Sequence, residues 1–310
     1  MMESPQHDQV PLRHRLLAAL VAALWGVNFL AIHTALEHFP PFLCGAIRWT
    51  VMAIPTLLFV PRPRVPVRYL LGYGVGFGVL QFAFLYWGMA IGMPAGLASL
   101  VLQSSAPFTV ILGALLMGDR PSRRAAIGVG VAVAGLAVVG SQRMAGAALL
   151  PFVLTVLGGL GWALGNLASR AARPEHPLRL TMWMSVVPPV PMLALSLGIE
   201  GPDAIAQAMS TSFEAPVALL GIAYTVLVAT VVGSGIWTWL MARHPAGTVA
   251  PWSMLVPVVG MSAAWLVLGE RPHPVETFGG ALVVAGVIGG MRTAPSLHAH
   301  RLRREPRRAV

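Results

Sequence analysis

Long apolar runs, separated by short polar segments, divide most of the 310-residue chain. They cover residues 16 to 36, 41 to 60, 69 to 91, 95 to 117, 124 to 140, 147 to 169, 178 to 199, 215 to 241, 247 to 268 and 276 to 291. An α-helix needs about 20 apolar residues to cross a hydrocarbon layer of about 30 Å. The pattern therefore predicts an all-α integral membrane protein with ten transmembrane helices.

Composition agrees with this pattern, because 56% of the residues are hydrophobic and only 10% are charged. A water-soluble fold of this size would lack polar side chains to cover its surface. The first run, within "RHRLLAALVAALWG", starts like a signal peptide but continues to Leu36 without a clear cleavage site. We expect it to be the first span, with the lipid bilayer as the partner of the whole chain.

All 21 basic residues are arginines, and their distribution along the chain predicts an orientation. The N-terminal segment and the segments after even-numbered spans hold 18 of them, whereas Arg143 and Arg271 follow odd-numbered spans and Arg48 lies inside the second span. Cytoplasmic segments carry this excess of positive charge. We therefore expect a multi-pass inner-membrane protein with both termini in the cytoplasm. The net charge of +10 is explained without nucleic acid as a partner. The Arg-rich end, "RLRREPRRAV", is expected to be a disordered tail against anionic lipid, with an interaction tail as the alternative.

The stretch "AGLASLVLQSSAPFTVILGALLMGDRP" returns 151 residues later as "AGTVAPWSMLVPVVGMSAAWLVLGERP". Between 95 to 140 and 246 to 291, ten of 46 positions are identical, and they mark the starts and ends of spans. Gly128 matches Gly279 and Gly135 matches Gly286, while "WGVN" in span 1 is echoed by "WALGN" in span 6.

The repeating unit is therefore five spans long, and an odd number of spans inserts the second copy upside down. We expect repeats at residues 16 to 144 and 145 to 292, between a cytoplasmic segment 1 to 15 and a tail 293 to 310. Inverted repeats are typical of transporters, in which one central site opens to either side in turn.

The segments "WGVNF", "GAIRW", "QFAFLYWGMAIGMPAGLASLVLQ", "TVVGSGIW" and "APWSMLVPVVG" resemble the EamA branch of the drug/metabolite transporter superfamily. The similarity extends from about Leu16 to Met291. The resemblance implies a ten-helix carrier that exports amino-acid-related metabolites such as cysteine or O-acetylserine. An exporter of a different amphiphile, such as a drug or an aromatic amino acid, is the alternative.

Arg48 is the one ionised side chain placed well inside a predicted span, where a charge costs about 2.5 to 3.5 kcal/mol on insertion scales. One interpretation is a clamp for a substrate carboxylate. The other is a structural tether to backbone carbonyls or to Glu37.

Further candidate substrate contacts are uncharged polar or aromatic residues inside spans: Trp25, Asn28, Gln81, Gln103, Trp162, Asn166, Tyr224, Trp237 and Trp252. Helical spacing also places Tyr73, Phe77 and Phe84 with Gln81, and Ser99 and Pro107 with Gln103. Helix packing or an interfacial belt is the alternative role for the aromatic residues, and hydrogen bonding between helices for the amides. Together they suit a small zwitterionic or neutral polar metabolite.

Several chemistries are not expected. All eleven Asp and Glu residues lie in loops, tails or at span ends, so proton coupling through a membrane acid is not predicted. Cys44 is the single cysteine, and no sequence motif indicates a metal site, a cofactor or catalysis. An intramembrane enzyme would need a nucleophile with a base, and a receptor or scaffold would need a soluble module. A non-enzymatic carrier is therefore the prediction, and a homodimer is compatible with it.

Overall fold

The computed structural model describes residues 11–145, 148–244 and 246–291, which are helical apart from short connections. Nine helical runs in these residues are long and apolar enough to cross a membrane: Leu12–Leu36, Pro41–Phe59, Val67–Ala90, Ala95–Met117, Arg123–Met144, Leu149–Ala172, Pro177–Glu200, Pro216–Met241 and Ala250–Leu268. Pro274–Gly290 is a shorter apolar helix. The chain is therefore a multi-pass, all-α membrane protein. Each apolar run of the sequence falls on one of these helices, while the count of ten crossings stays a prediction.

Five of the helices are unbroken: α1 (Leu12–Leu36), α2 (Pro41–Phe59), α7 (Arg123–Ala145), α8 (Leu149–Ala172) and α16 (Pro274–Met291). The other runs change helix type along their length. They comprise α3 (Val67–Tyr73), η1 (Gly74–Leu80) and α4 (Gln81–Ala90); α5 (Ala95–Val101), η2 (Leu102–Ser104) and α6 (Ser105–Met117); α9 (Pro177–Met184), α10 (Pro189–Leu195) and η3 (Ser196–Glu200); α12 (Pro216–Ala223), η5 (Tyr224–Gly233) and α13 (Ser234–Met241); and α14 (Ala246–Val249), η6 (Ala250–Met254) and α15 (Leu255–Leu268). The segments η1, η3 and η5 are π-helical, and η2 and η6 are 3₁₀-helical.

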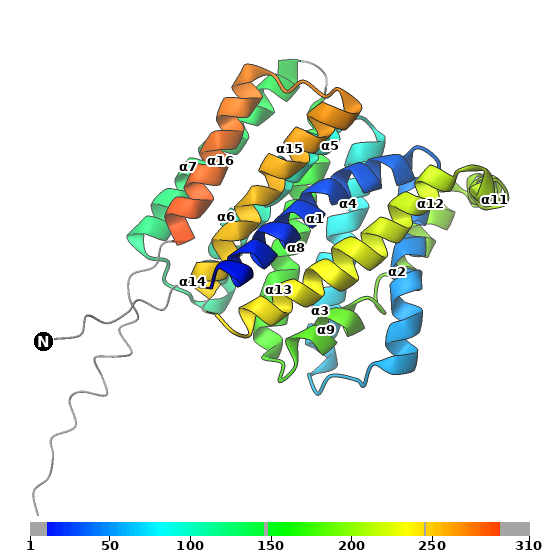
Figure 1. Ribbon diagram of the computed structural model, residues 1–310, viewed down its shortest axis with the longest axis horizontal. Coiled ribbons are helices and arrows are strands. Elements are labelled where there is room, and N and C mark those ends of the chain that lie inside the picture. Colours follow the sequence, from blue (N-terminus) through cyan, green and yellow to red (C-terminus); the bar gives the residue numbers. More distant parts are fainter. Residues whose placement is uncertain (1–10, 146–147, 245, 292–310) are drawn as a thin grey trace, which may run out of the picture.

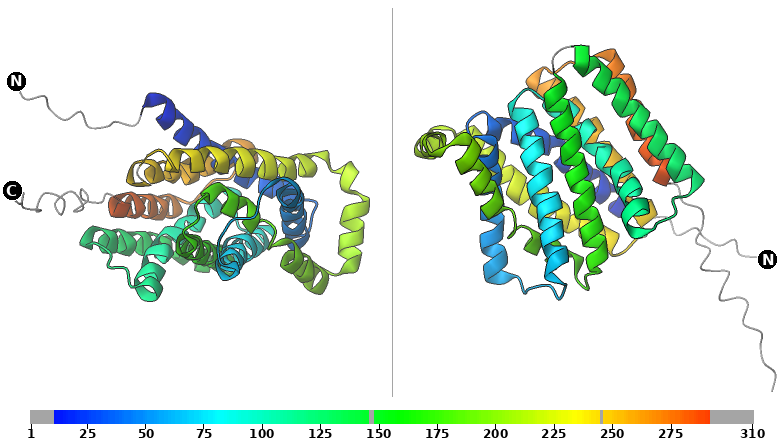
Figure 2. Two further views of the ribbon diagram at one scale, coloured as in Figure 1. Left: turned by 90° about the horizontal axis from the view of Figure 1, so that it is seen from below. Right: turned by 180° about the vertical axis from the view of Figure 1, so that it is seen from behind.

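One helix was not expected from the apolar pattern. The segment between the seventh and eighth runs forms α11 (Pro202–Ser210), followed by the single turn η4 (Ser212–Glu214). Pro202 occupies its first turn, where the missing N–H costs nothing, and Asp203 follows it, favourably placed toward the positive end of the helix. α11 lies crosswise at the edge of the bundle opposite α7 and α16 (Figures 1 and 2).

The repeated Gly-Asp-Arg-Pro and Gly-Glu-Arg-Pro segments end α6 and α15 in the same way. Gly118 and Gly269 adopt the left-handed conformation, with φ of 70° and 68°, which a residue with a side chain rarely adopts. The next amide in each copy bonds back into the helix, from Asp119 N to Gly113 O at 3.1 Å and from Glu270 N to Ala264 O at 3.3 Å. Both copies therefore end this helix with a left-handed glycine cap.

Glycines bring α7 and α16 into close contact along one edge of the bundle (Figure 1). A Cβ on Gly128 would lie 2.4 Å from the carbonyl oxygen of Gly286, and one on Gly135 would lie 2.5 Å from that of Gly279. Small residues at such positions let helix backbones approach each other closely in membranes. The two contacts are equivalent in the repeat, because Gly128 corresponds to Gly279 and Gly135 corresponds to Gly286 at the offset of 151 residues.

Candidate functional site

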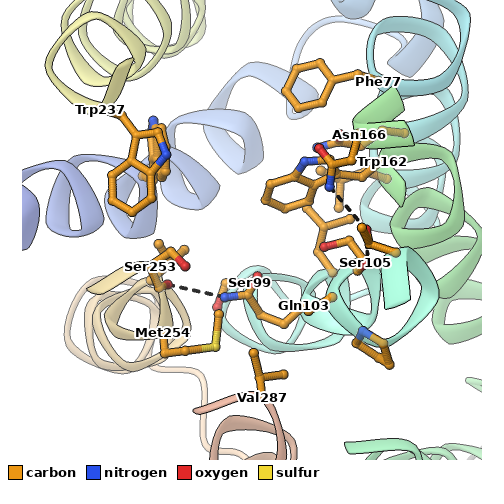
Figure 3. A pocket seen from close by; sticks show the side chains of 18 of the residues that line it. Phe77, Ser99, Gln103, Ser105, Trp162, Asn166, Trp237, Ser253, Met254 and Val287 are labelled. Carbon is orange, nitrogen blue, oxygen red and sulfur yellow. Dashed lines mark hydrogen bonds between the residues drawn. The ribbon is translucent and has the colours of Figure 1, made fainter. Parts of the chain in front are cut away.

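A cavity of about 560 Å³ lies in the bundle and is lined mainly by apolar and aromatic side chains, with a few polar groups among them. Its residues come from α1, α2, the third and fourth runs, α7, α8, α9, η5, α13, η6, α15 and α16. Figure 3 shows Trp237 on one side of the space and Phe77, Trp162 and Asn166 on the other. A concave, mostly apolar site with a few placed polar groups is typical of small-molecule binding.

Eight of the ten residues proposed from the sequence as substrate contacts line this cavity: Trp25, Asn28, Arg48, Gln81, Gln103, Trp162, Asn166 and Trp237. Tyr224 and Trp252 are not part of the lining. The hydroxyl of Tyr224 donates to the carbonyl of Leu24 at 3.1 Å, which ties η5 to α1. Trp252 packs against the small cluster formed by Ala18, Leu240 and Val249.

Arg48 is buried, with 5% of its surface exposed, and lies on α2 at the deep end of the cavity. Its Nη1 donates to the hydroxyl of Tyr86 at 3.0 Å and its Nη2 to that of Thr230 at 3.1 Å. The guanidinium stacks over the ring of Phe82, with 3.9 Å from Cζ to the ring centroid. The ion pairs among the described residues do not include Arg48, and its Nε has no hydrogen-bond partner.

Neither structural tether considered for Arg48 is formed, because its partners are hydroxyl groups and aromatic rings. Glu37, directly after α1, instead has its Oε1 atom 3.6 Å from Nε2 of His33. Burying a guanidinium without an anion costs free energy.

The four cavity amides fall into two pairs. Gln103 donates to the carbonyl of Ser253 at 3.3 Å, and Asn166 donates to the hydroxyl of Thr109 at 3.3 Å, as the dashed lines in Figure 3 mark. In contrast, Asn28 Oδ1 and Gln81 Oε1 are buried without any hydrogen-bond partner. Two of the amides therefore link helices, and two have a carbonyl oxygen without a partner among the described residues.

The aromatic residues are held in fixed orientations. Trp25 Nε1 donates to the carbonyl of Ala229 at 2.8 Å, and its ring lies 5.2 Å from that of Trp237. Trp162 meets Phe77 edge to face at 6.0 Å. These contacts fix the walls of the cavity in position.

Most of the hydroxyl groups in the lining were not predicted from the sequence; they include Ser105, Thr109, Thr181, Thr230, Ser234, Thr238 and Ser253. Serine and threonine are common in membrane helices, so no spacing distinguished them. Phe84, expected on the same face as Tyr73, Phe77 and Gln81, is outside the lining, and Phe82 takes its place. The π-helical segment η1 precedes these residues and rotates the face that follows it.

The cavity extends toward one end of the bundle, which we call the Arg-rich face because Arg62, Arg120, Arg170 and Arg243 lie there at or just beyond helix ends. Its lining includes Ala125, Thr181, Thr238 and Gly290, each within one or two turns of a helix end on that face.

At the opposite face α5 packs against α15 and closes the bundle. The Glu270 carboxylate accepts hydrogen bonds from the backbone amides of Ala95 at 2.7 Å and Gly96 at 2.9 Å. Residues 86–98 and 257–285 contribute nothing to the lining, whereas Ile32, four residues before the end of α1 on this face, is part of it.

Asp119, at the position equivalent to Glu270 in the first copy of the repeat, has a different hydrogen-bond partner. Asp119 pairs with Arg170 at the Arg-rich face through two hydrogen bonds, of 2.5 and 2.7 Å. The guanidinium holds the pKa of this carboxyl below its usual value, chiefly by hydrogen bonding. Among the described residues, no three His, Cys, Asp or Glu side chains come together as a metal site.

Apolar helices around a solute-sized, partly polar cavity define a multi-pass membrane protein of the carrier class. Comparison with known proteins specifies the family. The model of the EamA-like transporter family matches residues 13–141 and 149–291, and the chain belongs to this family. The resemblance found in the sequence is thereby confirmed.

The chain is 39% identical over 277 residues to a probable amino-acid metabolite efflux pump of Salmonella typhimurium, covering 87% of this chain and 92% of that protein. It is 38% identical to the protein of the same description in Escherichia coli, with the same coverage. A probable terminal-alkyne amino-acid exporter of Streptantibioticus cattleyicolor is 29% identical, over 87% of this chain and 90% of that protein. A crystal structure with 18% sequence identity shares the fold with a TM-score of 0.54, covering 90% of this chain and 96% of the other.

Proposed function

We propose that this protein is an inner-membrane secondary carrier that exports small amino-acid-related metabolites of the cysteine or O-acetylserine type. The observation that carries the proposal is Arg48, a buried guanidinium without a carboxylate partner and the one charged side chain among the described residues of the lining. A substrate carboxylate would supply the missing anion and accept from the fixed fork of donors. The two relatives described as amino-acid metabolite efflux pumps support the same substrate class.

The remaining substrate contacts in this proposal are Trp25, Asn28, Gln81, Gln103, Trp162, Asn166 and Trp237, which line the cavity. Trp25, Trp162 and Trp237 would cover the apolar part of the substrate, and the amides would orient its polar groups. Tyr224 and Trp252 act through packing.

We further propose alternating access by two inverted five-span repeats, residues 16 to 144 and 145 to 292. Several pairs of features separated by about 151 residues support this arrangement. The glycine contacts between α7 and α16 join equivalent pairs of residues, Gly128 with Gly286 and Gly135 with Gly279. The third and eighth runs both contain a π-helical segment, and the fourth and ninth both contain a 3₁₀ segment. Irregular helix segments of this kind occur at hinges and binding sites.

In this proposal the Arg-rich face is cytoplasmic, both termini lie on that side, and the described conformation is open to the cytoplasm. The distribution of arginines supports the orientation. An exporter in this conformation is ready to load substrate from inside the cell.

Purified protein in liposomes tests the transport function. Liposomes loaded with one unlabelled amino acid should accumulate the same radiolabelled amino acid by counterflow, and O-acetylserine or cysteine should give the largest signal. Formation of a new product would indicate an enzyme, and binding without flux would indicate a receptor. Absence of counterflow across a screen of all amino acids would contradict the proposal.

A second candidate is an exporter of an aromatic amino acid. The aromatic lining and the volume of about 560 Å³, larger than a cysteine requires, favour it. Tryptophan and phenylalanine in the same screen distinguish the two candidates, because a strong preference for them over O-acetylserine would favour the aromatic substrate.

A further inference from the structure

Three cavity residues carry buried polar atoms without any hydrogen-bond partner: Asn28, Arg48 and Gln81. The great majority of buried polar atoms in proteins have a hydrogen-bond partner, so an atom without one indicates a site where a ligand or water could bind. Gln81 is 3% exposed and Arg48 is 5% exposed, whereas the Asn28 residue is partly buried. The other two cavity amides, of Gln103 and Asn166, already have protein partners.

The unpaired atoms are of two kinds. Arg48 Nε is a donor on a cation, whereas Asn28 Oδ1 and Gln81 Oε1 are carbonyl acceptors. A carboxylate offers acceptors alone, so it suits Arg48 and is repelled by the two carbonyl oxygens. An ammonium group offers three donors and no acceptor, so it suits those oxygens and not Arg48. A ligand that satisfies all three atoms carries both groups.

The backbone fixes Gln81 at this position. It follows the π-helical segment η1, and its amide donates to the carbonyl of Gly76, five residues earlier. The backbone also lies close to α8, since a Cβ on Gly161 would come within 2.7 Å of Gln81 N. Gly161 therefore allows the approach that places this side chain in the cavity.

We infer that Asn28 and Gln81 hold the substrate's ammonium group through their amide oxygens, while Arg48 holds its carboxylate. The inference rests on the proposed function and narrows it, because the carrier then selects free α-amino acids and rejects derivatives whose nitrogen is acylated. Such a derivative keeps the carboxylate but presents a neutral amide, which has one donor and cannot satisfy both oxygens.

The isomers O-acetylserine and N-acetylserine provide the test, because they contain the same atoms and differ in which group bears the acetyl. Counterflow of radiolabelled O-acetylserine into proteoliposomes is measured at mildly acidic pH, where the protonated amine resists acyl migration, with either unlabelled isomer as competitor. We expect wild-type protein to require at least about tenfold more N-acetylserine for half-inhibition. Equal competition by both isomers would overturn the inference while leaving the export function standing. If O-acetylserine gives no counterflow, the pair alanine and N-acetylalanine is used, and failure of every amino acid contradicts the proposed function itself.

The variants Asn28→Leu and Gln81→Leu remove the acceptors, and we expect each to reduce the discrimination between the isomers to about threefold or less. Asn28→Asp and Gln81→Glu keep acceptor oxygens and should retain discrimination of at least tenfold. Asn166→Leu removes a cavity amide that already has a protein partner, so it should lower flux without changing the ratio. If the leucine variants do not accumulate in the membrane, Asn28→Asp and Gln81→Glu test the inference instead. Loss of discrimination between the isomers in both would show that the amide NH₂ groups, and not the oxygens, face the ligand, and would overturn the inference.

Discussion

Arg48 combines burial, a full charge and the lack of an ionic partner in one side chain. If it binds the substrate carboxylate, Arg48→Gln should lower counterflow by at least about 20-fold, because an ionic bidentate contact is replaced by weak neutral bonds. Arg48→Lys keeps the charge without the planar fork and should recover part of the flux. Transport assays with each variant at matched membrane abundance make the comparison. A fall in the melting temperature of both variants in parallel with flux would show that Arg48 is structural.

Tyr224 provides a contrasting substitution at the same scale. Its hydroxyl bonds to the backbone of α1 and does not line the cavity. Tyr224→Phe should therefore destabilise the protein by about 1 kcal/mol, the net contribution of one hydrogen bond, and leave counterflow near the wild-type rate. Thermal melting in detergent and the counterflow assay measure the two effects. A large loss of flux without destabilisation would contradict this and indicate that Tyr224 contacts the substrate.

At the scale of elements, the tight pairing of α7 with α16 depends on glycine. Gly128→Val places methyl groups against the Gly286 carbonyl, which a Cβ would already approach to 2.4 Å, so the helices must separate. We expect a loss of about 1 to 3 kcal/mol of stability, typical of overpacked contacts. Gly130→Val introduces the same side chain on the same helix and is the matched control, since no atom lies within 4 Å of a Cβ added there. Equal melting temperatures for the two variants would contradict the packing argument.

Glu270 joins the fourth and ninth runs at the face opposite the Arg-rich face. Glu270→Ala removes both hydrogen bonds to the α5 amides, so the contact between α5 and α15 should open more often. In a background in which Cys44, the single cysteine, is replaced by serine, Ser99→Cys reports on this opening through a membrane-impermeant thiol reagent. We expect labelling from that side to rise at least about threefold. Glu214→Ala, on an exposed carboxylate of the same face, should not change it.

Helix type explains which parts of the site were predictable. A constant rotation per residue placed Trp25, Asn28, Trp162 and Asn166 correctly, because α1 and α8 are unbroken. Where the helix widens or tightens, the same assumption succeeds for Gln81, Gln103 and Trp237 but fails for three other residues. Phe84 follows η1, Tyr224 opens η5 and Trp252 lies within η6, and none of the three lines the cavity. Periodicity of apolar residues does not reveal π or 3₁₀ segments, so the sequence could not show which residues in and after those segments turn away from the cavity.

For the whole molecule, the apolar pattern was sufficient to find every long helix. It missed α11, whose nine residues are too few and too polar to register as a span. The partners of the two matching carboxylates also could not be predicted from the sequence. Asp119 accepts hydrogen bonds from Arg170, whereas Glu270, at the equivalent position, accepts from backbone amides of α5.

Orientation is the prediction that belongs to the whole molecule. Reporter fusions should place the segment with Arg120, Arg123 and Arg124 in the cytoplasm, together with the segments after spans 2 and 6, because arginine-rich segments resist translocation. Fusions after spans 1 and 3 should report the opposite side. A periplasmic signal from the Arg120 segment would contradict the ten-span topology.

Arg48 is the one charged side chain that the described residues bring to the cavity, and this has an electrical consequence. A zwitterion adds no net charge to it, so the loaded and the empty carrier bear the same charge as they reorient. The membrane potential is worth about 2.3 kcal/mol per elementary charge per 100 mV. In a cycle that is not coupled to an ion, the potential therefore acts equally on the loaded and the empty step and does no net work on export. In such a cycle, the rate of export would depend on the concentration gradient of the metabolite and not on the membrane potential.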